Sequence, residues 1–413
     1  MANEPWKKDK KWFVSPWNYA DEVTKEFKFA KNVKVHDITL RDGEQQTGVI
    51  LSMDDKIRIA EGLAEAGVHR IEAGMPIVSP SDAAAIKEIA RRNLGPQIFA
   101  FSRCMVEDVQ RAIDTGVSGV VMEIPSSQHM VDIAYKWPME KAIETSIEAT
   151  KFAHKNGLEV VFFPIDFSRS EMNWVLNMID RVGREGHMDA LALVDTFGVV
   201  SPHAMRYFVR EVKKKIPNKR LEAHFHQDFG MGVANTIMAL AEGVEVMHTT
   251  VLGIGERAGN TPMEETIMAL LTMYGVDCGI KTEKLRPLAD LVQKLTGVNV
   301  PDNKPVVGHA LYQIESGIIA SWFKNCGEDY ATELFPVRWD VVGQPPAEIV
   351  MGKGSGIDSV KMWCNDLGIE ASEEEALKIT AAVKQASLKS KKLLTQNEFK
   401  KLAQDVLKQR SPA

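Results

Sequence analysis

Two histidines stand two residues apart in the stretch "LEAHFHQDFGMGVAN", at positions 224 and 226 of a chain with ten histidines in total. In a β-strand, residues i and i+2 point to the same face. His224 and His226 on a strand would therefore present two imidazoles side by side, and such a pair can bind a cation. A His-x-His pair on its own is also compatible with simple packing or solvation, so other residues have to decide between these two interpretations.

Further polar residues follow other strand-like segments of the chain. Asp42 lies in "TLRDGEQ", and Asn260 ends the glycine-rich stretch "GIGERAGN". Together with His224 and His226, these residues would form a mixed nitrogen and oxygen set that suits a divalent Lewis acid such as Mg²⁺, Mn²⁺ or Zn²⁺. The absence of a cysteine from this set argues against a closed structural zinc site.

The elements that must bring these residues together are short apolar runs that alternate with longer amphipathic segments. Helix-like stretches such as 52–67 and 79–93 separate the runs, and each opens with a serine cap signal. Eight β/α units in a row predict a (β/α)₈ TIM barrel of the α/β class. The expected strands are 33–39, 68–74, 97–101, 119–124, 159–166, 190–195, 221–226 and 244–251.

A doubly wound open sheet is the rival architecture for the same alternation. It would usually carry a glycine-rich phosphate turn after its first strand, and "HDITLRDGEQQTG" is not such a turn. In a closed barrel, the first and eighth strands are neighbours, and the seventh adjoins the eighth. Because catalytic residues of such barrels sit at the carboxyl ends of the strands, Asp42, His224, His226 and Asn260 can converge there.

The remaining segments suggest three parts. Residues 1–32 read as an irregular N-terminal arm, residues 33–275 as the barrel domain, and residues 276–413 as helical C-terminal subdomains. Within the last part, 281–297 reads as a helix and 372–409 as two capped amphipathic helices.

Composition excludes several classes of protein. The net charge of −6 gives no basic footprint for nucleic acid, and no apolar run approaches the roughly 18 residues of a membrane span. The polar, lysine-rich start "MANEPWKKDKKWFV" is no secretory signal, and the four cysteines are scattered without CxxC spacing. These features predict a cytoplasmic protein with reduced thiols.

Three motifs give the chain a specific resemblance. "HDITLRDGEQQTG", "HFHQDFGMGVAN" and "GIGERAGN" resemble the signatures of the metal-dependent TIM-barrel lyase and synthase superfamily, which includes 2-isopropylmalate synthase, homocitrate synthase and 3-hydroxy-3-methylglutaryl-CoA lyase. The resemblance runs from about residue 33 to the C-terminus and includes "IVMGKGSGIDSV" at 349–360. It is closer to the synthases, because the chain lacks the catalytic cysteine that the lyase carries in its glycine-rich loop.

The resemblance implies roles for individual residues and a reaction. Asp42, His224 and His226 would hold the metal with Asn260 nearby, and Arg41 would polarise the keto oxygen of a 2-oxo acid. The implied reaction is a Claisen-type condensation of an acyl-CoA with a 2-oxo acid, carried out by a homodimer. Further substrate-binding and acid–base positions that it implies are Gln45, Glu72, Arg103, Thr196 and Glu222.

Two positions depart from the synthase pattern. Ile165 in "FFPIDFSRSE" stands where the synthases carry a glutamate, and Ile319 in "ESGIIASW" stands where they carry a catalytic histidine. Other residues, with His129 and His309 as candidates, could supply the missing acid–base groups. Alternatively, the enzyme could be a lyase that cleaves a 3-hydroxy acid or its CoA thioester, or a metal-binding protein without activity. The intact set of polar residues disfavours the last reading, because polar groups that converge without a function reduce stability.

Alternation along 159–166 places Val161, Phe163 and Ile165 on one face of the expected fifth strand. An apolar face there predicts a substrate with an alkyl or aryl group and no second acid group. Simple filling of the barrel core would give the same pattern.

Overall fold

The computed structural model describes residues 4–408, and they form two compact units. One unit runs from Pro16 to Val300, and the other joins the N-terminal segment up to Ser15 with the chain from Pro301 onwards. The domain boundaries after residues 32 and 275, drawn from the sequence, stay predictions.

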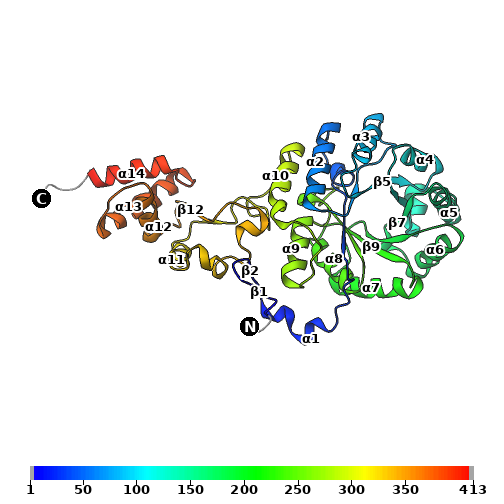
Figure 1. Cartoon of the computed structure of the whole chain (residues 1–413), viewed down its shortest axis with the longest axis horizontal. Helices are drawn as coiled ribbons and strands as arrows, with labels where there is room; N and C mark the ends of the chain where they lie inside the picture. Colours follow the sequence, from blue (N-terminus) through cyan, green and yellow to red (C-terminus); the bar gives the residue numbers. More distant parts are fainter. Residues whose placement is uncertain (1–3, 409–413) are drawn as a thin grey trace. The chain divides into compact units, whose positions relative to one another are not determined.

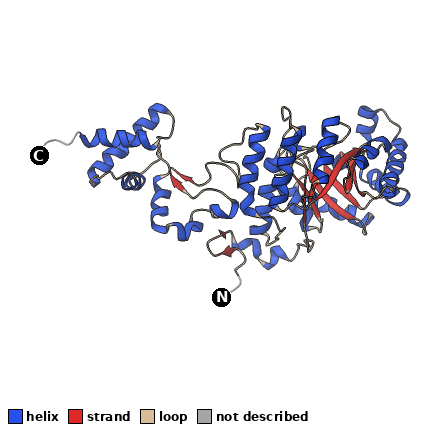
Figure 2. Ribbon diagram, turned by 45° about the horizontal axis from the view of Figure 1, so that its top comes forward, coloured by secondary structure: helices blue, strands red, loops and turns tan. Residues whose placement is uncertain are grey.

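The first unit contains a closed barrel of eight parallel strands (Figure 1; red strands in Figure 2). The last strand pairs with both the first and the seventh, so the predicted neighbours are confirmed. The predicted TIM-barrel fold, followed by C-terminal helices, is therefore confirmed. In chain order, the strands are β3 (Lys34–Asp37), β4 (Arg70–Glu72), β5 (Gln97–Arg103), β6 (Gly119–Pro125), β7 (Glu159–Ile165), β8 (Ala190–Asp195), β9 (Arg220–Phe225) and β10 (Val246–Thr249).

Helices surround the strands, and their ends follow local sequence signals (Figure 1). The first of them begins with a capping box between Ser52 and Asp55, and Gly67 ends it in the left-handed conformation that glycine adopts without strain. The next begins after Ser79, which caps its first turn, as predicted. These helices are α2 (Met53–Ala66), α3 (Pro80–Arg91), α4 (Val106–Asp114), α5 (Met139–Lys155), α6 (Met172–Glu185), α7 (Pro202–Lys215), α8 (Gly232–Ala241) and α9 (Met263–Met273).

One helix of the predicted C-terminal region belongs to the barrel unit. Helix α10 (Leu285–Thr296) packs on α2, where Gly62 leaves room for the side chains of Leu288 and Leu291. The short helix α1 (Asp21–Thr24) is also part of this unit.

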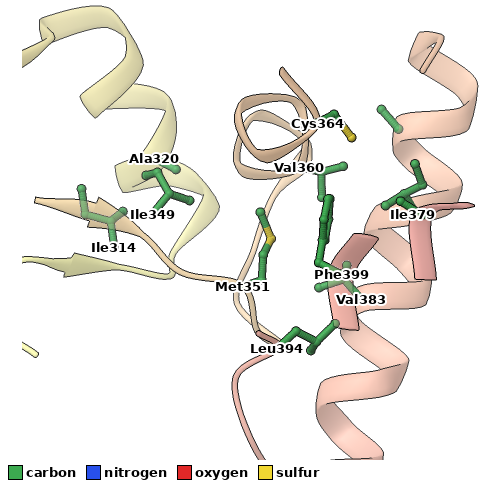
Figure 3. Packing of buried hydrophobic residues seen from close by; sticks show 12 residues of the cluster. Ile314, Ala320, Ile349, Met351, Val360, Cys364, Ile379, Val383, Leu394 and Phe399 are labelled. Carbon is green, nitrogen blue, oxygen red and sulfur yellow. The ribbon is translucent and has the colours of Figure 1, made fainter. Parts of the chain in front are cut away.

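The second unit has its own hydrophobic core, in which Met351, Val360, Ile379 and Phe399 point toward one another (Figure 3). The N-terminal segment joins this unit through a backbone bridge between Trp12 and Val337. Its elements are β1 (Lys7–Lys8), β2 (Trp12–Phe13), β11 (Gln313–Ile314), α11 (Gly317–Cys326), β12 (Glu348–Ile349), α12 (Ile357–Asp366), α13 (Glu373–Ser390) and α14 (Gln396–Lys408).

Within residues 4–408, no helix is both long enough and apolar enough to cross a bilayer. The cysteines are free thiols: Cys104, Cys278 and Cys364 are buried, and Cys326 is half-buried.

Candidate active site

A cavity of about 160 Å³ lies at the carboxyl ends of the barrel strands. Its lining combines charged or polar side chains on one part with apolar side chains on another. The polar members are Arg41, Asp42, Gln45, Glu123, Thr196, His224, His226 and Glu256. The apolar members are Met75, Phe101, Phe163, Ile165 and Val194.

Asp42, His224 and His226, here called the polar set, converge in this cavity. The Nε2 atoms of the two histidines lie 3.3 Å apart, and they are 3.6 and 3.9 Å from one carboxylate oxygen of Asp42. Atoms that share one ion at about 2.1 Å lie roughly 3 to 3.5 Å from each other, so this spacing fits a bound cation. The three residues are buried and could hold a metal, as the sequence predicted.

Electrostatics favours the neutral imidazoles that metal binding requires. Burial, followed by the neighbouring His226, holds the pKa of His224 well below its usual value, and burial also lowers the pKa of His226. Among the described residues, no group bonds to the buried Oδ1 atom of Asn260, whereas its Nδ2 donates to Asp42 at 2.7 Å. This oxygen is a possible further ligand.

Asn260 can take this position because the loop "GIGERAGN" has a glycine, Gly255, beside the Asn260 amide. Gly255 has a φ of +152°, and a Cβ there would collide with the Asn260 amide and lie 3.1 Å from Asp42. The glycine therefore makes room for Asn260 and Asp42 themselves.

Arg41 is fixed beside the polar set. Its guanidinium donates to Asp42 at 2.6 Å and also to Glu72, and it stacks over the ring of Phe101 at 3.9 Å. Burial raises the pKa of Glu72, but the charge of Arg41 and the contact with His36 at 3.3 Å outweigh it and lower the pKa to about 2. Glu72 thus orients Arg41 and does not itself line the cavity.

A buried charged layer lies beneath the polar set. Glu222 precedes His224 by two residues, so its side chain also points into the barrel, one level lower. Arg70 donates to its carboxylate at 2.8 Å, and His248 lies 2.9 Å away. Burial would raise the pKa of Glu222, but these two partners hold it well below its usual value.

The structure therefore does not bring Glu222 to the cavity, where the acid–base role implied by the resemblance would need it. His36, Glu222 and His248 form a second buried group with metal-binding residue types. The guanidinium of Arg70 already occupies one oxygen of Glu222 in that group, so it is the less open of the two buried groups.

The other predicted site residues divide into two classes. Gln45, Thr196, Phe163 and Ile165 line the cavity, and the Thr196 hydroxyl accepts a hydrogen bond from the backbone of residue 166 at 2.8 Å. Four other predicted site residues do not line the cavity: Arg103, His129, Val161 and His309.

Each of these four has a different environment. Arg103 is bound to Asp108 at 2.6 Å, and His129 contacts Asp166 at 3.0 Å. Val161 is fully buried in the barrel core. His309 belongs to the other compact unit.

Two charged residues of the cavity were missed in the sequence, Glu123 and Glu256. The signal for Glu123 was available, because it is the one charged residue in the apolar run "GVVMEI". Glu256 lies within the recognised motif "GIGERAGN" and gave no signal of its own.

Comparisons with known proteins place the chain in a family. It matches the HMGL-like family over residues 32–292. It is 41% identical to the "Putative (R)-citramalate synthase" of Archaeoglobus fulgidus over 87% of this chain and 73% of that protein. It is 36% identical to a homocitrate synthase of Methanothermobacter thermautotrophicus over 92% of this chain and 95% of that one.

A 2-isopropylmalate synthase of Methanocaldococcus jannaschii is 36% identical over 83% of this chain and 65% of its own. Among solved structures, the HMG-CoA lyase of Bacillus subtilis superposes with a TM-score of 0.60 at 21% identity, over 66% of this chain and 96% of that one, which supports the fold alone. The chain belongs to the HMGL-like family, and it is an acyltransferase of the 2-isopropylmalate, homocitrate and citramalate synthase type.

Proposed function

We propose that the enzyme condenses an acyl-CoA with a 2-oxo acid in a Claisen-type reaction that releases coenzyme A. The observation that carries this proposal is the convergence of Asp42, His224 and His226 beside the Arg41 guanidinium in one cavity. The relatives support the reaction class, because they are named as citramalate, homocitrate and isopropylmalate synthases.

The polar set would hold a divalent cation, Mg²⁺, Mn²⁺ or Zn²⁺, through Asp42, His224 and His226, with the Asn260 oxygen as a further ligand. When bound, the cation would supply Lewis acidity toward the carbonyl of the 2-oxo acid. Arg41, held in place by Glu72, stabilises negative charge that develops on the carbonyl oxygen. The Thr196 hydroxyl accepts a backbone hydrogen bond, so its own proton remains available to the substrate carboxylate.

The apolar part of the cavity supports a 2-oxo acid with a single carboxylate and an apolar substituent. Phe101, Phe163 and Ile165 offer no partner for a second carboxylate, and burying one without a partner is unfavourable by several kcal/mol. Glu123 lines the same cavity and would repel a second negative charge. A dicarboxylic 2-oxo acid such as 2-oxoglutarate is therefore expected to be a poor substrate.

The space for a second reactant adjoins this cavity. A neighbouring pocket of about 160 Å³ shares Arg41, Gln45 and Met75 with it. Two pockets that meet at Arg41 suit a reaction in which two molecules form a carbon–carbon bond.

The test is release of the coenzyme A thiol by the full-length protein, reloaded with metal. Acetyl-, propionyl- and butyryl-CoA are each offered with pyruvate, 2-oxobutyrate, 2-oxoisovalerate and 2-oxoglutarate. Thiol release is expected with one of the monocarboxylic acids and not in His224→Ala. Preferred use of 2-oxoglutarate would contradict the substrate class. Absence of thiol release together with cleavage of 3-hydroxyacyl-CoA would favour the lyase reading.

The homodimer, the cytoplasmic location and the acid–base roles of His129 and His309 stay predictions from the sequence. Sedimentation equilibrium of the full chain tests the first of these.

A further inference from the structure

Glu123 is the feature of the cavity that the proposed function leaves unexplained. It is the only residue of strand β6 that is not fully buried, and it pairs in register with Phe163 on β7, which also lines the cavity. Within the described part of the chain, no hydrogen bond or ion pair engages its carboxylate. A carboxylate in such a place is unfavourable for stability, and such groups are concentrated at functional sites.

The charged groups around Glu123 are Arg41, Arg103, Asp108 and Glu72. Both cations are committed to other carboxylates: Arg41 bonds to Asp42 and Glu72, and Arg103 bonds twice to Asp108, at 2.6 and 3.0 Å. Burial therefore dominates, and it raises the pKa of Glu123 to about 7. A carboxyl group with this pKa can accept a proton near neutral pH and release it again.

Glu123 and Ile165 lie on the adjacent strands β6 and β7. The last residue of β6, Pro125, pairs with Ile165, and Glu123 lies two residues earlier on the same face of the strand. A carboxylate thus lies on the strand adjacent to the isoleucine and one level lower, within the same cavity.

We propose that Glu123 is the general base that removes a proton from the acyl α-carbon of the CoA thioester. This inference rests on the proposed condensation. The carboxylate of Glu123 takes the α-proton, and the electron pair of the broken C–H bond forms the enolate. The enolate carbon then bonds to the carbonyl carbon of the 2-oxo acid, whose π electrons move onto the oxygen beside Arg41. The resulting alkoxide takes a proton from solvent and becomes the hydroxyl group of the product. Water then cleaves the thioester C–S bond: one of its protons goes to the departing thiolate, which leaves as the coenzyme A thiol, and the acyl group becomes a new carboxylate with release of the other proton. Glu123 returns its proton to solvent.

Two variants of Glu123 distinguish a general base from a residue that only binds substrate or only supports the fold. Glu123→Gln keeps the shape of the side chain but cannot accept a proton, and Glu123→Asp keeps the carboxylate on a shorter arm. The matched control is Glu107→Gln, at an exposed glutamate of α4 outside the cavity. Thermal unfolding of each protein verifies that it is folded, and Glu123→Asp carries the test if Glu123→Gln does not fold.

The measurements are thiol release and α-deuteration of acetyl- and propionyl-CoA in D₂O, the latter followed by mass spectrometry with and without pyruvate. For Glu123→Gln we expect kcat to fall about 10²- to 10⁴-fold, with loss of α-deuteration and little change in KM. Glu123→Asp should retain part of both activities, and Glu107→Gln should match the wild type. Binding of acetyl-CoA, measured by calorimetry, should be the same in all four proteins.

The outcomes distinguish this inference from the proposed function. Thiol release and α-deuteration at wild-type rates in Glu123→Gln overturn the role of Glu123 and leave the condensation standing. A higher KM with an unchanged kcat also overturns it, because it shows a group that only binds substrate. Wild-type α-deuteration without thiol release, lost in Glu123→Gln, supports the base and refutes the condensation. Absence of both reactions in the wild type refutes both proposals.

Discussion

The Nε2 atoms of His224 and His226 lie 3.3 Å apart, and they are 3.6 and 3.9 Å from the same carboxylate oxygen of Asp42. Two imidazoles and a carboxylate at this spacing could hold a cation.

Purified protein should bind about one divalent cation per chain in this site, and His224→Ala or His226→Ala should lose it, because each removes a ligand atom. Metal analysis after chelator treatment and reloading measures this. His203→Ala, at an exposed histidine of α7, is the control. Equal metal content in all four proteins would rule out the site.

Replacing Arg41 by lysine should reduce kcat by on the order of 10²-fold, because lysine keeps the charge but lacks the planar fork that contacts Asp42 and Glu72 together. Steady-state thiol release measures this, with Arg58→Lys on the exposed face of α2 as control. Turnover at the wild-type rate in Arg41→Lys would remove Arg41 from the mechanism.

Glu222→Gln should destabilise the barrel by at most about 3 to 5 kcal/mol at pH 7, because buried Arg70 then keeps only the partly exposed Glu159 as a carboxylate partner. The folded-state pKa of Glu222 lies below its ordinary value of 4.5, so the stability that its ionisation contributes is present above pH 4.5 and is lost as the pH falls. Denaturant unfolding at pH 7 and at about pH 4 tests both points, and the deficit of the variant should shrink at the lower pH. A deficit that grows on acidification would contradict this account.

Glu123→Gln, unlike Glu222→Gln, should stabilise the protein above neutral pH. The pKa of Glu123 is raised from 4.5 to about 7, so the wild type loses stability as the pH rises through this window. The free energy of unfolding of the variant should exceed that of the wild type by an amount that grows from pH 5 to pH 8, to at most about 3 kcal/mol. Unfolding of metal-free protein at the two pH values measures it, and an advantage that is independent of pH would show that Glu123 does not titrate in this range.

Ile165→Glu should not raise thiol release, although it restores the residue that the resemblance implies. The new carboxylate would lie on the strand adjacent to Glu123, and two nearby like charges raise each other's pKa. Comparison of kcat in Ile165→Glu and in the isosteric Ile165→Gln measures the effect of charge alone. Faster turnover in the glutamate variant would identify the wild type as a weakened synthase of the ordinary kind.

Much of the barrel, and the convergence of Asp42, His224 and His226, could be predicted from the sequence. Alternating apolar and amphipathic runs predict β/α units, and Ser52 and Gly67 mark the two ends of α2 through local hydrogen bonding and backbone conformation. The i, i+2 spacing of His224 and His226 fixes both side chains on one face of a strand. These features depend on a few neighbouring residues, so local sequence is sufficient to determine them.

The tertiary structure decided what each charged residue does. Closure of the barrel placed Arg70 and His248 against Glu222, which therefore serves as an ion-pair partner beneath the cavity. The same closure left Glu123 facing the cavity without a partner, although the sequence had marked it only as part of an apolar strand. The height of a side chain in the barrel and the charges around it depend on the register of strands that are far apart in the chain. Burial and pairing follow from that register, and they determine which carboxylates stay ionised and which can accept a proton.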